Sequence, residues 1–231
     1  MKIAEHLLKM INRENKKLIL LPPKTGTVSF ESIFKNDFCG YESYSRSNPV
    51  HHIHMMLHEA VDCYGIDDIE NWEIYQTARN PMDRIVSAFL HQKRILRRLG
   101  KLVINFDFEE FIELVNKHHH LLPEKERTFA NSVLSKDDIM PENRKSSRGV
   151  RFYIPQTTWA DPDKYNVKYI KLGEDNSEIY KQMGLPEDLT IPFLNQSKLN
   201  KSRYKYLHTD KTNKIIHSLY SDDFKKINYG K

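Results

Sequence analysis

The sequence predicts an α/β domain with three layers, in which helices flank a central, mainly parallel sheet. Short apolar runs that are typical of buried strands alternate with segments whose apolar residues have helical spacing. Three such runs stand out, at 17–21, 72–78 and 167–172. A helical pattern follows each run, as a parallel sheet requires, because each of its strands needs a crossover connection. Ligands of such sheets bind beyond the carboxyl ends of the strands, so the residues after these runs are the first candidates for a site.

The length and composition predict one ordered, globular domain over 1–231. Of the 231 residues, 39% are hydrophobic and 29% are charged, with 8 glycines and 10 prolines. A chain of this length buries roughly 70–75% of its unfolded surface, so it needs no disulfide or metal to fold. Its two cysteines, Cys39 and Cys63, lack CxxC spacing. Such a small number of cysteines favours a reducing compartment. The formal net charge of +5 favours an anionic ligand.

The apolar runs are too short to cross a membrane. The longest, such as 18–21, fall far below the ~20 residues that a membrane-spanning helix needs. The first residues carry Glu5, His6 and Lys9 among apolar positions and so lack the continuous apolar core of a signal peptide. We therefore expect a cytoplasmic protein without a membrane span.

Helical patterns fill most of the remaining sequence. Asn80 and Asp107 are expected to cap helices, with Pro81 at the first position of the helix that follows Asn80. A polar, basic surface loop is expected over 135–151. The helices predicted by apolar spacing cover 2–14, 51–64, 81–99, 108–117, 175–183 and 209–227, with one more beginning at Val28.

The segment Pro-Lys-Thr-Gly-Thr-Val-Ser at 23–29 follows the first strand and has the composition of a phosphate-binding loop. Gly26 permits a tight turn, so that backbone N–H groups can approach an anion at the start of the next helix. Lys24 adds a positive charge, and Thr27 and Ser29 add hydroxyl donors. The segment is not a Walker A loop, which requires GxxxxGK[ST]. The alternative interpretation is a strand–turn–helix corner that contains a glycine.

A second candidate phosphate site follows the strand at 72–78. Arg79 lies at its carboxyl end, and Ser87 lies on the helix after it. The arginine fork and the hydroxyl are suited to binding a second phosphate. The alternative is a helix cap with surface charges, which is the role expected for Asp83 and Arg84.

Together, the two segments resemble the sulfotransferases that use 3′-phosphoadenosine 5′-phosphosulfate (PAPS). In that family, the pattern PKxGTxS holds the 5′-phosphosulfate and the pattern RNPxDRxVS holds the 3′-phosphate. This chain has both patterns, in the same order, at 23–29 and 79–87. The resemblance implies a P-loop-like fold and PAPS as sulfate donor. The cofactor-binding residues that it implies are Lys24, Thr25, Gly26, Thr27, Val28 and Ser29 on the 5′ side, and Arg79 and Ser87 on the 3′ side.

The acceptor is inferred from a weaker resemblance. The chain lacks the glycine-rich RKGxxGDWK segment of cytosolic members that act on small molecules. Its end, LYSDDFKKINY at 219–229, is similar to that of Golgi-type carbohydrate sulfotransferases. This implies a carbohydrate acceptor, with a tyrosine, a lipid or a small metabolite as alternatives. The sequence indicates no oligomeric state.

Histidines between the two motifs are the candidate bases. Uronyl 2-O-sulfotransferases have a His-x-His at a similar position, with the second histidine as base. His52 and His54 match it, so the resemblance implies His54 as base, His52 as reserve and Lys24 as the cation near the departing phosphate oxygen. An imidazole suits general base catalysis at neutral pH. The carboxylates of Glu31 and Glu59 are the alternatives.

The sequence predicts neither a metal site nor a nucleic-acid partner. His54 and His58 have i,i+4 spacing, but they belong to no HExxH motif and no third ligand is evident. The resemblance implies no metal either, because a lysine and backbone donors stabilise the developing charge. Two rival functions are a magnesium-dependent P-loop kinase and a non-catalytic basic protein that binds polyanions.

Overall fold

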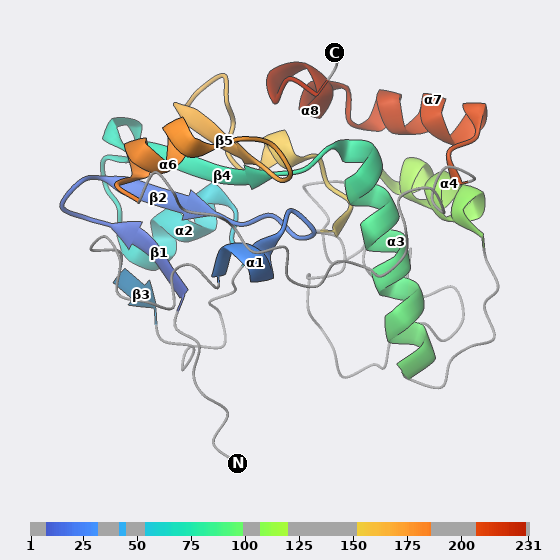
Figure 1. Ribbon diagram of the computed structural model, residues 1–231, viewed down its shortest axis with the longest axis horizontal. Coiled ribbons are helices and arrows are strands. Elements are labelled where there is room, and N and C mark those ends of the chain that lie inside the picture. The colour runs from blue at the N-terminus through green and yellow to red at the C-terminus, as the bar shows by residue number, and fades with distance from the viewer. Residues whose placement is uncertain are drawn as a thin grey trace. The chain divides into compact units, whose positions relative to one another are not determined.

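The described part of the structure forms two compact units. The structure is a computed structural model (Figure 1). One unit comprises residues 1–79 and 156–196, and the other comprises 80–155 and 197–231. The single domain predicted over 1–231 stays a prediction. The residues that the structure describes are 8–31, 42–44, 54–98, 107–119, 152–185 and 207–229.

The first unit contains a mixed sheet whose described strands have the order β3-β1-β2-β4-β5. β2 and β4 are parallel neighbours, as are β4 and β5, and these are the three strands that the sequence predicts. β1 pairs antiparallel with both β2 and β3. The α/β prediction is confirmed. The bounds of the strands are β1 Leu8–Asn12, β2 Lys17–Leu20, β3 Glu42–Tyr44, β4 Glu73–Ala78 and β5 Val167–Lys171.

The helix predicted over 2–14 is wrong where the structure describes it, because β1 occupies that segment. Ile11 of β1 lies opposite Leu18 of β2 in an antiparallel pair. The turn between the two strands is closed by Asn15, whose backbone N–H donates to Asn12 Oδ1 at 3.0 Å. The apolar spacing fits a helix locally, but pairing with a buried strand outweighs it.

Apolar side chains cover both faces of β2. Consecutive strand residues face opposite sides of a sheet, and Leu18, Ile19 and Leu20 are all at most 1% exposed. Helices α1, α2 and α6 lie next to the sheet in the first unit (Figure 1). The hydrophobic core of this unit includes Leu57 and Ala60 of α2. Helix α2 begins at residue 57, later than the predicted 51. The helix bounds are α1 Thr27–Glu31, α2 Leu57–Tyr64 and α6 Ser177–Met183.

The described part of the second unit is helical. Its core includes Phe108, Phe111, Ile112 and Val115, which have the helical spacing that predicts a helix over 108–117. The single helix predicted over 209–227 is two helices, since the chain leaves helical geometry at Tyr220. The helix bounds are α3 Pro81–Arg98, α4 Phe108–His119, α7 Asp210–Leu219 and α8 Ser221–Lys226.

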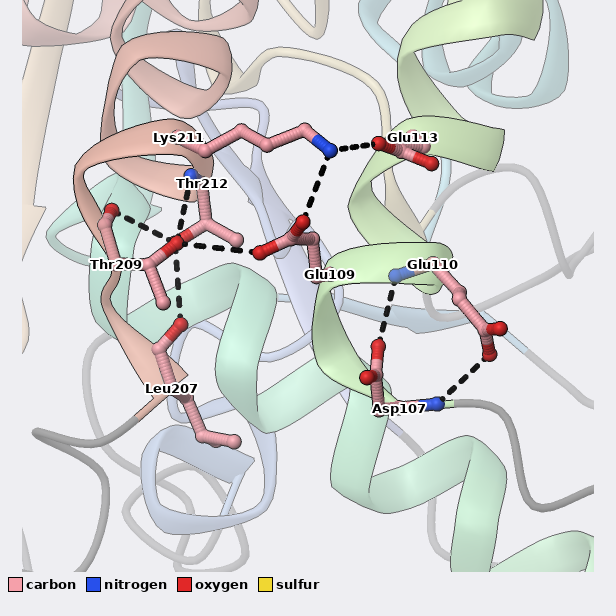
Figure 2. Close-up of polar contacts among 8 residues, drawn as sticks. All are labelled: Asp107, Glu109, Glu110, Glu113, Leu207, Thr209, Lys211 and Thr212. Carbon is pink, nitrogen blue, oxygen red and sulfur yellow. Dashed lines mark hydrogen bonds and ion pairs between the residues drawn. The ribbon is translucent and has the colours of Figure 1, made fainter.

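The helix caps predicted from the sequence are present. Asn80 Oδ1 accepts from the backbone N–H of Met82 at 2.9 Å, and α3 begins at Pro81. Asp107 and Glu110 bond reciprocally at the start of α4, each side chain accepting from the other residue's backbone N–H (Figure 2). These bonds satisfy N–H groups that have no partner within the helix.

Lys211 links α7 to α4 within the second unit (Figure 2). Its ammonium group forms ion pairs with Glu109, at 2.9 Å, and with Glu113. The hydrogen bonds to Glu113 and Glu109 raise the pKa of Lys211. Thr209 caps α7 by accepting from the backbone N–H of Thr212. The polar contacts therefore fix the start of α7 beside α4.

Two further expectations concern membrane spans and the loop over 135–151. None of the helices in the described ranges combines the length and the apolar character needed to cross a lipid bilayer. The surface loop expected over 135–151 lies outside the described residues.

Candidate active site

The loop at 23–29 and Arg79, the first residue of the second candidate segment, both follow strands of the first unit's sheet. β2 and β4 are parallel, with Leu20 opposite Gln76, so the loop after β2 and Arg79 after β4 leave from neighbouring carboxyl ends. The hydroxyls of Thr25 and Thr77 join these two segments through a hydrogen bond of 2.6 Å. The loop and Arg79 therefore leave from adjacent strand ends, while their binding of one ligand stays a prediction.

Two threonine hydroxyls hold the loop in shape. Thr25 Oγ1 donates to the carbonyl of Pro22 at 2.6 Å, and Thr27 Oγ1 donates to the same oxygen at 3.3 Å. Because a hydroxyl has one proton, Thr77 is the donor in its bond to Thr25. Thr25, Thr27 and Ser29 are all buried. Backbone N–H groups, rather than the hydroxyls of Thr25 and Thr27, are thus the loop's candidate donors to an anion.

The backbone of the loop enters the left-handed region twice. Lys24 has a φ of 69° and Gly26 has a φ of 90°. Such a conformation is costly for a residue with a Cβ, and strain of this kind clusters at ligand-binding segments. Alternation of left- and right-handed residues turns successive N–H groups toward one side, which creates a concave anion site. Positive φ at Lys24 and Gly26 is compatible with a phosphate loop, and the phosphate-loop interpretation stays a prediction.

If the loop binds the 5′ side of the nucleotide that the resemblance implies, Gly26→Ala should weaken binding of its desulfated form, 3′,5′-ADP, by about 5- to 150-fold. A Cβ at Gly26 would lie 2.8 Å from Leu172 Cδ1 and would also be strained by the φ of 90°. Strain of this kind costs on the order of 1–3 kcal/mol, which is lost from binding if the free loop relaxes away from the conformation that holds the anion. Isothermal titration calorimetry measures the change. Gly184→Ala is the matched control, since its φ is 80° and no atom lies within 4 Å of its added Cβ. Equal effects of the two substitutions would contradict this account.

His54 lies beside the strand that leads into the loop. Its Nδ1 is 2.6 Å from the carbonyl oxygen of Leu21. A carbonyl only accepts, so Nδ1 carries the proton of the neutral ring and the lone pair lies on Nε2. The imidazole is half-buried and precedes α2, which begins at Leu57. A histidine that acts as a general base through Nε2 requires this tautomer, because its lone pair must lie on Nε2.

The other candidate bases are less well placed or lie outside the described residues. Glu59 Oε2 accepts from the backbone N–H of Met56 at 2.7 Å and so caps α2. His58 is exposed on α2, whereas His54 lies before that helix, so the shared helix face expected from their spacing is wrong. His52 and the side chain of Glu31 lie outside the described residues. Within the described part of the chain, no three histidine, cysteine or carboxylate side chains gather as a metal site would require.

Comparison with known proteins agrees with this geometry. The model of the sulfotransferase family matches residues 10–230. The chain belongs to the sulfotransferase family. The match spans both units of this sulfotransferase and includes both motifs and His54. No curated protein and no solved structure matches the chain.

The second motif of this sulfotransferase extends over both units. Arg79 is half-buried and directly follows β4 in the first unit, and Ser87 is half-buried on α3 in the second. Asn80 and Pro81, between them, form the start of α3 as predicted. The pairing of Arg79 with Ser87 around a 3′-phosphate stays a prediction.

Arg84 corrects an expectation about the same motif. The sequence predicts a surface charge, but the side chain is 2% exposed. Its Nη1 donates to the carbonyl of Ile154 at 2.7 Å. Burial lowers the pKa of Arg84, while electrostatic interaction with Tyr220 and with the fully buried Asp223 acts in the opposite direction. Arg84 is therefore a structural residue of the second unit's core.

Proposed function

We propose that this sulfotransferase is a PAPS-dependent O-sulfotransferase whose acceptor is a carbohydrate hydroxyl and whose product is 3′,5′-ADP. The family gives the reaction class. The donor and the acceptor class follow from the motifs and from the sequence at 219–229, and the observation that carries the base is the hydrogen bond between His54 Nδ1 and the Leu21 carbonyl. This bond supports a general base beside the start of the loop at 23–29. The sequence and the backbone of that loop suit a phosphate group.

The donor set of the loop fits a phosphosulfate. Lys24 and Gly26 both have positive φ, as residues of anion-binding loops often do, and a Cβ at Gly26 would lie 2.8 Å from Leu172 Cδ1. When bound, PAPS supplies the sulfuryl group, whose bond to the bridging phosphate oxygen breaks as the acceptor oxygen attacks. The residues that would hold the 5′ side are Lys24, Thr25, Gly26, Thr27, Val28 and Ser29, with Arg79 and Ser87 on the 3′ side.

The residues of the chain divide the chemistry between them. His54 takes the proton of the acceptor hydroxyl at Nε2, because its Nδ1 is already engaged with Leu21. Lys24 offsets the negative charge that grows on the departing phosphate oxygen. Arg79 selects the donor by its 3′-phosphate, since a guanidinium binds phosphate oxygens in pairs. His52 is the reserve base of this proposal.

We expect Arg79→Ala to weaken binding of 3′,5′-ADP by about ten- to a hundredfold. The loss of a charged hydrogen-bond partner costs about 1.5–3 kcal/mol, which corresponds to that range. Calorimetry with 3′,5′-ADP and with 5′-AMP isolates the effect of the 3′-phosphate, because 5′-AMP affinity should not change. The control is Arg13→Ala, which removes an exposed arginine of the same unit. Unchanged affinity for 3′,5′-ADP would refute the role of Arg79.

The full proposal is tested by product analysis. The protein is supplied with PAPS and a panel of glycans, tyrosine peptides, lipids and small alcohols, and mass spectrometry identifies the sulfated product. Sulfation of a glycan supports the proposal. Sulfation of a peptide, a lipid or a small alcohol would support the reaction but would contradict the carbohydrate acceptor. Binding of 3′,5′-ADP in EDTA, together with no binding of ATP in the presence of magnesium, excludes the magnesium-dependent kinase. Binding that depends steeply on salt but not on nucleotide identity would instead favour the polyanion-binding protein.

A further inference from the structure

The backbone of Arg79 is held by the side chain of Gln156. Gln156 Oε1 accepts from the backbone N–H of Arg79 at 2.8 Å, and Gln156 Nε2 donates to the carbonyl of Arg79 at 2.9 Å. The two residues are 77 positions apart in the chain but lie in the same unit. Gln156 has no exposed surface. One carboxamide therefore engages both backbone polar groups of Arg79.

This contact extends β4 beyond its last residue. The parallel pairing with β5 ends with Ala78 opposite Lys171, so Arg79 is the first residue after the ladder. The carboxamide gives Arg79 one donor and one acceptor, as a neighbouring strand would. Gln156 is itself fixed, because its carbonyl accepts from Gln76 Nε2 at 2.8 Å. The backbone of Arg79 is therefore ordered by a buried and anchored side chain.

We infer that Gln156 is a positioning residue for the recognition of the 3′-phosphate. It acts through Arg79, because the backbone dihedrals of Arg79 set the direction in which its guanidinium leaves the strand. Without the carboxamide, the part-buried N–H and carbonyl of Arg79 each lose a partner, and the backbone shifts to regain one. The inference rests on the proposed role of Arg79, and it adds a residue that neither phosphate motif contains.

The test measures nucleotide selectivity in the full-length chain. Gln156→Met keeps the length and volume of the side chain but removes both hydrogen bonds to Arg79. Calorimetry gives the affinities for 3′,5′-ADP and 5′-AMP, and we expect their ratio to fall about tenfold, as it would for a loss of 1.4 kcal/mol. The affinity for 5′-AMP should be unchanged. Gln182→Met is the matched control, since Gln182 is exposed and its side chain bonds Glu178 on the same helix.

The possible outcomes separate this inference from the proposed function. Wild-type protein that binds both nucleotides equally would overturn both. If Arg79→Ala abolishes the preference for 3′,5′-ADP but Gln156→Met retains it, the inference alone is wrong. An equal loss of affinity for both nucleotides in Gln156→Met would reveal a general structural role and would also overturn the inference.

Two further measurements apply if Gln156→Met does not fold. Gln156→Glu keeps an acceptor for the Arg79 N–H but removes the donor to its carbonyl, so its selectivity should lie below that of wild type. In the wild-type protein, amide hydrogen exchange at Arg79 should be slow, because that N–H is bonded to a buried acceptor. Exchange of the Arg79 amide at the rate of an exposed loop would overturn the inference.

Discussion

Replacement of His54 by alanine is expected to lower turnover by about 10²–10⁴-fold, the usual contribution of a general base. The structure gives the physical reason. The Leu21 carbonyl holds the proton of the ring on Nδ1, and the lone pair on Nε2 is then able to take the acceptor's proton. Initial rates at saturating donor and acceptor measure the loss. The affinity for 3′,5′-ADP, measured by calorimetry, should remain that of wild type because the phosphate donors are intact.

His58→Ala is the control for this experiment. His58 is exposed and lies four residues further along, on α2, so its removal should leave turnover unchanged. A His54→Ala variant with wild-type rates would assign the base to another residue, and His52→Ala would then be the next variant to measure. If His54→Ala also lost its affinity for 3′,5′-ADP, the bond to Leu21 would serve the shape of the loop rather than proton transfer.

The second large effect is expected for Arg84→Met, which should lower the free energy of unfolding by about 3–5 kcal/mol. The substitution retains most of the apolar stem but removes the guanidinium. Asp223, which is fully buried, then loses the positive charge that acts on it, and the carbonyl of Ile154 loses a donor. A buried charge without compensation is strongly destabilising. Urea denaturation, followed by circular dichroism, measures the change.

Two further variants test whether the loss of stability comes from the burial of Arg84 rather than from the removal of any arginine. Arg94→Met removes an exposed arginine from the same helix and should change the unfolding free energy by less than about 0.5 kcal/mol. The double variant Arg84→Met with Asp223→Leu should recover part of the loss, because both buried charges are then removed together. If Arg84→Met is no more destabilising than Arg94→Met, the buried charge of Asp223 is not compensated by Arg84.

Local sequence patterns predicted the parts of the fold that depend on local interactions. The apolar runs of β2, β4 and β5 are short and continuous, as in strands that are buried on both faces. Asn80 and Asp107 cap helices because their side chains accept from N–H groups only two or three residues ahead. The two phosphate motifs likewise each follow one predicted strand, whereas the adjacency of these strands is a finding of the structure.

Features that depend on distant partners were not predictable. The segment of β1 has helical spacing, and only its pairing with β2 makes it a strand. Arg84 lies in a polar stretch, and its burial depends on α8, far along the chain. The role of Gln156 has no local sequence signal either, because it depends on the hydrogen bond to Arg79, 77 positions away. Each of these cases is decided by tertiary contacts that outweigh local preference.

The bond between Arg79 and Gln156 also bears on how the protein forms during synthesis. It joins the position at which the chain leaves the first unit to the position at which it returns. The ribosome releases Arg79 77 residues before its partner, an interval of roughly 4–15 s at the usual rate of translation. Throughout that interval the nascent chain already contains the complete loop after β2, yet β4 lacks both Gln156 and β5. An ordered arginine at this sheet edge is thus a property of the finished chain, and a fragment that stops before residue 156 would not acquire it.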